Sequence, residues 1–290
     1  MAALRRSRVF FFVLLFAVAW GVMVLISPSK PESTAVPADP GLWPFAVAIA
    51  PWLLVFAVAY GLFQWQVRRA LATVQRNRDA NALLDAGDLA SAISLYDQLL
   101  KECPRNFMSI NVLVYDRALA LFRQGRQDEA LEAFKDLTAR KLRRNEAMLA
   151  PLVHFQLALC YALNGELVAA EEHHTRAHEM GSVQVAGFLT LVVTVIGLRQ
   201  GRHQAVLKDL GQEWARVEGM LGVHLARVLR LLSAFGHSQL PDAQAHAEHI
   251  QQMLAGVRPF RPGEFDYLVI NWPEFRAFLV EQGFVAAKAT

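Results

Sequence analysis

The sequence predicts an all-α protein in which two transmembrane helices precede a solenoid of helical hairpins. Two observations lead to this fold class. The first quarter of the chain holds two long apolar runs without a charge, and the remainder repeats one pattern of small and aromatic residues around glycines spaced 38, 40 and 36 residues apart. With 290 residues, the chain has room for about 200 residues of repeats beyond the apolar region.

The two apolar runs, Val9–Ile26 and Leu42–Phe63, contain no Asp, Glu, Lys or Arg. A helix needs about 20 apolar residues to cross the hydrocarbon layer, and inside that layer its backbone must satisfy its own hydrogen bonds. We therefore predict transmembrane helices at 9–28 and 42–65. A cleaved signal peptide is the alternative for the first run, but that run is longer than a usual signal-peptide apolar region.

Basic residues flank the two runs on their outer sides. They are Arg5, Arg6, Arg8, Arg68, Arg69, Arg76 and Arg78. The connecting loop 29–41 holds only Lys30 against Glu32 and Asp39. Because Lys and Arg stay on the cytoplasmic side, the pattern predicts a cytoplasmic N-terminus at 1–8 and a short Pro-rich external loop. Both termini and the repeats are then cytoplasmic, and the protein is integral to a bacterial inner (plasma) membrane.

In each repeat a helix ends at a glycine. An alanine follows the glycine, and a large residue follows the alanine. Glycine ends a helix at low cost because it lacks a Cβ, and paired alanines let two helices approach closely. A single hairpin cannot bury its own apolar face, so the units must stack. The signature positions are Ala80, Gly87, Ala92, Tyr96, Pro104, Ala118, Gly125, Ala130, Phe134, Ala158, Gly165, Ala170 and Gly201.

This spacing of small, Gly, Ala and aromatic residues resembles the tetratricopeptide repeat family. The resemblance implies a TPR-like α-solenoid over 66–255, with further, more divergent units around Gly201 and Gly236. The segment 256–290 resembles the capping segment that closes bacterial arrays of this family, with Pro273 in the first turn of its helix. Because no proline lies between Trp52 and Cys103, the second span can continue as one helix into the first repeat.

The sequence carries no pattern typical of catalysis. Phosphate-binding glycine loops, a nucleophile elbow and a zinc-protease motif are absent, so we predict no enzyme, no catalytic residue and no cofactor. His174 and His178 share a helical face but lack a third ligand, and His246 and His249 fit a solvent-facing helix, so no metal site is predicted. Residues 66–290 hold 25 basic and 24 acidic side chains, a balance that gives nucleic acid no binding footprint.

The family resemblance implies a concave wall lined by the first helix of each unit. An apolar wall of this kind suits a helix laid into a groove, and the chain's own C-terminal segment is the alternative occupant. We expect the substitutions Tyr115→Asp and Phe155→Asp to abolish partner capture without unfolding the repeats. The predicted partner-groove residues are Val112, Tyr115, Leu119, Phe122, Leu152, Phe155, Leu159, Phe188, Leu191, Val195 and Leu198.

Taken together, these features predict a membrane-tethered scaffold or adaptor that organises unidentified protein partners at the cytoplasmic face of the membrane. No small-molecule substrate is expected. The alternative function is an auxiliary or regulatory subunit whose membrane hairpin packs against a transporter or envelope enzyme. The layout of two spans followed by repeats also resembles that of the HemY-type inner-membrane proteins.

Overall fold

The structure is a computed structural model that describes residues 43–102, 110–142, 146–181 and 185–287. Over these residues every regular element is an α-helix or a short 3₁₀ helix, and no strand occurs, which confirms the predicted all-α class. Pro104 and the predicted first span at 9–28 lie outside the described residues, as do the predicted N-terminus 1–8 and loop 29–41.

The first described helix, α2 (Trp43–Asp85), runs without interruption from the second apolar run into the first repeat. This confirms that the two segments form one helix. Of the described helices, this is the one long and apolar enough to cross a membrane, over Ile49–Asp85, and its apolar window is not buried anywhere. The chain divides into two compact units between Leu71 and Ala72, within this helix.

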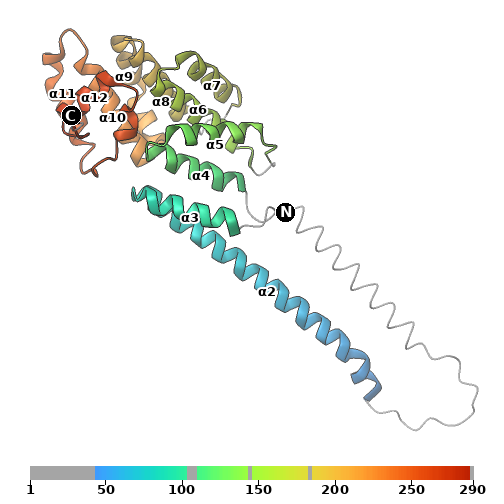
Figure 1. The fold of residues 1–290 in the computed structure, drawn as a ribbon. Helices are drawn as coiled ribbons and strands as arrows, with labels where there is room; N and C mark the ends of the chain where they lie inside the picture. The colour runs from blue at the N-terminus through green and yellow to red at the C-terminus, as the bar shows by residue number, and fades with distance from the viewer. Residues whose placement is uncertain (1–42, 103–109, 143–145, 182–184, 288–290) are drawn as a thin grey trace, which may run out of the picture. The chain divides into compact units, whose positions relative to one another are not determined.

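The second unit is built from short helices that fold back on one another in sequence order (Figure 1). Neighbouring helices along the chain make the main contacts, as expected of an array in which each hairpin packs on the next. The helices are α3 (Leu89–Glu102), α4 (Ile110–Arg123), α5 (Gln127–Ala139), α6 (Leu149–Asn164), α7 (Leu167–Glu179), α8 (Ala186–Arg199), α9 (His203–Met220), α10 (Val223–Ser238) and α11 (Ala247–Ala255).

The turns inside the first four hairpins share one backbone geometry. Gly87, Gly125, Gly165 and Gly201 all have a positive φ, between 73° and 86°. At Gly165 the amide donates to the Ala162 carbonyl and the next amide donates to the Tyr161 carbonyl, which closes α6 with the paired bonds of a left-handed C-terminal motif. Each of these glycines therefore sits where the first helix of a hairpin ends.

The small residues of the repeat lie where pairs of helices meet. Ala80, Ala92, Ala118, Ala130, Ala158 and Ala170 are all completely buried. The large residue that follows is also buried in the first two units, as Tyr96 and Phe134. In the third unit this position is His174, which is only half-buried because α7 borders an open groove.

The fifth unit differs from the prediction at Gly236. This glycine lies inside α10, two residues before its end, and does not close a hairpin. A Cβ at this position would lie 3.0 Å from Leu198 Cδ2 and 3.1 Å from Leu207 Cδ2. Gly236 is therefore a close-approach residue that lets α10 pack against α8 and α9.

The C-terminal segment 256–290 contains the 3₁₀ helix η4 (Asp266–Val269) and a final α-helix, α12 (Pro273–Glu281). Another 3₁₀ helix, η3 (Ala243–His246), directly precedes α11. Pro273 occupies the first turn of α12, as predicted, where a missing amide hydrogen costs little. Phe265, Phe275, Leu279 and Phe284 are buried in the same hydrophobic core as the repeats. The segment is therefore part of the fold of the array.

Candidate partner-binding surface

Most of the side chains predicted to line a partner groove are buried by the chain itself. Only Val112, Leu119, Leu152 and Phe188 are partly exposed. Phe155 and Phe188 lie together, with ring centroids 5.0 Å apart, and Leu152 packs beside Phe188. The buried residues are Tyr115, Phe122, Phe155, Leu159, Leu191, Val195 and Leu198.

Two of these side chains face their own array. The ring of Tyr115 lies 5.7 Å from that of Phe134 on α5, and its hydroxyl accepts a hydrogen bond from Gln156 on α6. Phe155 is 1% exposed. A buried aspartate at either position would have no partner, so it would destabilise the fold at the same time as it removed any contact. From this burial we expect both Asp variants to destabilise the repeats, so neither variant isolates partner capture from folding.

The C-terminal segment returns to the turns of the first units. The Arg261 side chain lies against Gly87, and Ile270 lies against Gly125, at 3.4 Å and 3.3 Å from where a Cβ would stand. Asn271 donates to the side-chain oxygen of Asn164, at the next turn, over 3.0 Å. Residues 261–271 thus follow the row of turns that joins the first and second helices of three successive hairpins.

A buried polar network holds this segment in place. The hydroxyl of Tyr267 lies 2.9 Å from His224 Nε2, and Arg227 donates to Glu264 over 3.1 Å. Burial lowers the pKa of His224, so the ring is neutral at pH 7. The hydrogen bond from His224, together with the Arg261 amide and Arg227, holds the pKa of Glu264 at about 2. Glu264 is therefore the anionic centre of the network.

A ring contact and a hydrogen bond from a side chain to the backbone also hold this segment. The ring of Phe122 meets that of Tyr267 edge-on at 5.0 Å, so one predicted groove residue is covered by the C-terminal segment. Gln127 donates to the Tyr267 carbonyl over 2.8 Å, although 140 residues separate them. The chain's own C-terminal segment therefore covers this part of the surface. This segment was the alternative occupant predicted for the groove.

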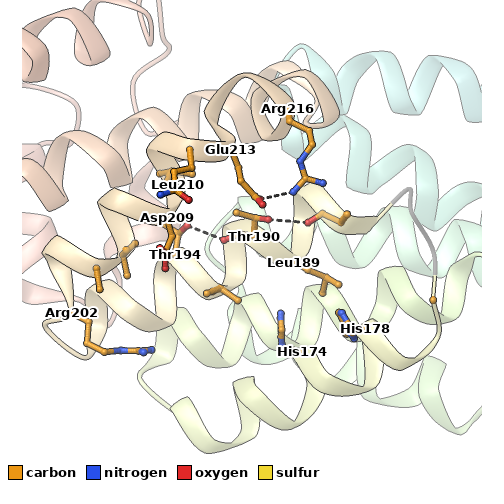
Figure 2. Close-up of a pocket in the computed structure, with 16 residues that line it drawn as sticks. His174, His178, Leu189, Thr190, Thr194, Arg202, Asp209, Leu210, Glu213 and Arg216 are labelled. Carbon is orange, nitrogen blue, oxygen red and sulfur yellow. Dashed lines mark hydrogen bonds and ion pairs between the residues drawn. The ribbon is translucent and has the colours of Figure 1, made fainter.

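An open groove lies elsewhere, between α7, α8 and α9 (Figure 2). Its volume is about 690 Å³. Helix α8 forms the floor, with α7 on one side and α9 on the other (Figure 2). The lining residues are His174, His178, Gly181, Ala186, Leu189, Thr190, Val193, Thr194, Arg202, Ala205, Val206, Asp209, Leu210, Gln212, Glu213 and Arg216.

The floor of this groove is apolar in its chemistry. Thr190 and Thr194 use their hydroxyls as donors to the carbonyls of Ala186 and Thr190, over 3.2 Å and 2.8 Å. These bonds satisfy the two hydroxyls within α8, and both threonines line the groove beside Val193, which is 44% exposed. Apolar surface of this kind is favourable to cover, because burying it removes it from water.

Charged groups stand along the α9 side of the groove, and two histidines stand along the α7 side. On α9, Glu213 and Arg216 form an ion pair of 2.5 Å, and Asp209 lies one turn earlier. On α7, burial and the nearby His178 lower the pKa of His174, so this ring is neutral at pH 7. Both signs of charge therefore border an apolar floor, an arrangement that suits an amphipathic protein segment.

Sequence reasoning did not identify this groove. Helix α8 is apolar around its whole circumference, so its composition does not show which side stays exposed. The one available signal was His174, which occupies a position filled by buried aromatic residues in the first two units. A polar ring at a packing position marks the place where α7 is not fully covered.

The comparison with protein families adds one finding to this geometry. Residues 113–140, which span most of α4 and all of α5, match the family model of the tetratricopeptide repeat. The match supports a tetratricopeptide repeat protein. It falls on the second predicted unit, and repeats of this family generally mediate contacts between proteins. The comparisons with curated proteins and with solved structures found no match.

Proposed function

We propose that the chain is a membrane-tethered tetratricopeptide repeat adaptor that holds a partner protein at the cytoplasmic face of the membrane. The tether rests on α2, whose apolar window has no buried residue over a length that can cross a bilayer. The adaptor role rests on the repeat itself, because repeats of this family generally mediate contacts between proteins.

The observation that carries the binding role is the open groove between α7, α8 and α9. Because seven predicted wall residues are buried and Phe122 is covered by Tyr267, the first-helix wall contributes only its four partly exposed residues. The α7–α9 groove, in contrast, offers about 690 Å³ above an apolar floor. We therefore assign the main partner contact to this groove, with an amphipathic segment of the partner as the occupant.

A photoreactive amino acid placed at single positions in intact cells tests this assignment. Val193 lies in the groove, whereas Val168 is exposed on α7 and does not line it. Irradiation should give a defined crosslinked product from position 193 and none from position 168. Because both valines are at the surface, neither replacement should unfold the array.

The same experiment separates the two candidate roles. Mass spectrometry of the product from position 193 should identify a protein with a soluble domain at the membrane surface if the chain is an adaptor. A polytopic membrane protein recovered in equal amount would support the auxiliary-subunit role instead. Equal crosslinking from positions 193 and 168 would contradict the groove assignment.

A further inference from the structure

A small pocket lies where the C-terminal segment meets the first turn of the array. Its volume is about 330 Å³, near the lower end of the range of about 300–1,000 Å³ that is usual for small-ligand pockets. It shares no residue with the α7–α9 groove, so its role does not depend on the proposed function. The lining residues are Asp85, Ala86, Gly87, Arg123, Arg227, Pro259, Phe260, Arg261 and Glu264.

One of the three arginines in this lining is a buried positive charge. Arg123, the last residue of α4, is 8% exposed. Among the described residues no carboxylate forms an ion pair with it, and its Nε has no hydrogen-bond partner. A buried charge without a counter-ion is costly, and a buried donor without an acceptor adds to the cost. An anion bound beside Arg123 would therefore stabilise the fold.

Most of the N–H donors of Arg123 are available to such an anion. Its Nη1 donates to the Leu84 carbonyl over 3.0 Å. Its Nη2 lies 3.4 Å from His224 Nδ1, and the same nitrogen lies 3.5 Å from Glu264 Oε1 and can serve only one of the two groups. Since a guanidinium carries five N–H donors, at least three of those on Arg123 have no partner in the described part of the chain.

The other two arginines differ in how their charges are balanced. Arg227 donates to Glu264 over 3.1 Å and to the Pro259 carbonyl over 2.6 Å, so its charge is already paired. Arg261 is exposed and lies against Gly87, and no carboxylate of the described residues pairs with its guanidinium. Arg261 is therefore a second unpaired cation in the lining.

A single unpaired carboxylate opposes these two cations in the lining. Asp85 is exposed at the end of α2 and forms no ion pair with a described residue. Its exposure lets the side chain turn toward water. Two unpaired guanidiniums, those of Arg123 and Arg261, therefore face one carboxylate that is free to move away, and the pocket attracts anions.

We propose that this pocket binds the phosphate group of a small solute. Guanidinium groups hold phosphate through charge-assisted hydrogen bonds, and a phosphate group carries nearly two charges and three acceptor oxygens. It can accept from Arg123 and Arg261 together, whereas a carboxylate offers a single charge. Because Arg123 ends α4 and Arg261 belongs to the C-terminal segment, the bound group joins this segment to the array.

Isothermal titration calorimetry of the full chain in mild detergent, with inorganic phosphate as the probe, tests the proposal. We expect one phosphate per chain. The unfolding temperature should rise more with phosphate than with chloride at the same ionic strength, because the bound ion stabilises the folded chain. Glycerol 3-phosphate, titrated in parallel, distinguishes the two sources of the group: tighter binding of the ester assigns the pocket to a phosphate ester, and equal or weaker binding assigns it to the free ion.

Four variants locate the site of binding. Arg261→Gln should weaken phosphate binding by about tenfold or more, because a hydrogen bond to a charged group is lost, and Arg123→Met should do the same. Asp85→Asn should strengthen binding, since it removes the opposing carboxylate. The matched control is Arg258→Gln, which makes the same change of charge at an exposed arginine of the same segment outside the pocket. It should leave the affinity unchanged.

The exposed positions keep the test valid if Arg123→Met does not fold. Arg261 and Asp85 are both at the surface, so their variants should retain the helical circular dichroism of the wild type. Unchanged phosphate binding in Arg261→Gln, or an equal loss in Arg258→Gln, would overturn the proposal. Tighter binding of acetate than of phosphate, or no binding of phosphate by the wild type, would overturn it as well.

Discussion

Among single residues, Asp116 on α4 has a carboxyl group whose ionised form is destabilised by burial. Burial raises the pKa of its carboxyl group to about 7, and within the described part of the chain no opposing charge offsets this cost. In the unfolded chain the same group titrates near 3.8. Between these two pH values the folded chain therefore holds a proton that the unfolded chain releases.

The first prediction concerns this carboxyl group. Its contribution to the free energy of unfolding is fully present below about pH 4 and is lost as the pH rises through about 7, because the folded form then buries a charge. An Asp116→Asn variant should match the wild type near pH 4 and exceed it in stability at pH 8. Urea unfolding of the full chain in detergent, measured across this range, gives the difference.

An exposed carboxyl provides the control for this measurement. Asp136→Asn makes the same change on the exposed surface of α5, where burial does not act on the carboxyl group. If Asp116→Asn were no more stable than the wild type at pH 8, the buried carboxylate would have a partner that the structure does not show, and the assigned cause would be wrong.

At the scale of elements, the C-terminal segment decides which surfaces remain open. It was predicted as an end cap, yet residues 261–271 lie on turns of units far earlier in the sequence. The Phe122–Tyr267 ring contact, the hydrogen bond from Gln127 and the network around Glu264 all join this segment to the array. It works as a strap along one edge of the repeats.

The second prediction tests the strap through Tyr267. Tyr267→Ala removes a buried ring, which costs about 3–5 kcal/mol of stability in a packed core, whereas Tyr267→Phe removes only a hydroxyl and costs about 1 kcal/mol. We also expect trypsin to cleave the alanine variant faster at Arg258 or Arg261, since the segment is released locally. Equal stability and equal cleavage of the two variants would show that the strap is not anchored there.

At the scale of the whole molecule, the proposed tether makes a prediction about topology. The run Ile49–Asp85 includes an apolar window with no buried part, and large exposed side chains such as Leu53 and Leu54 need a nonpolar solvent. The chain should therefore remain in the membrane fraction after alkaline carbonate treatment. Protease added to sealed cells should spare the repeats, and protease added to lysed cells should digest them.

Two results would contradict this topology. Release of the chain by carbonate would show that the exposed apolar run of α2 is covered by protein and not by lipid. Digestion of the repeats in sealed cells would place them outside, against the distribution of Arg and Lys around the two predicted spans. Either result would remove the proposed role at the cytoplasmic face.

The helices were predictable from the amino-acid sequence, and so were their hairpin turns and the small residues at their contacts. These features depend on local causes: Gly165 takes a positive φ that other residues avoid, and Ala158 and Ala170 leave room for neighbouring backbones. The continuity of α2 was also predictable, because no proline interrupts it after Pro51.

Contacts between distant parts of the chain determine which apolar surfaces are covered and which are open. Phe122 and Val193 are both apolar helix residues, but the strap returns across 145 residues to cover Phe122 with Tyr267, whereas Val193 stays exposed between α7 and α9. The rings of His246 and His249, which were expected to face solvent, are likewise half-buried against that of His237 because of how the last hairpin folds. Helical periodicity describes the near neighbours of a residue, and burial depends on elements that are distant in the chain.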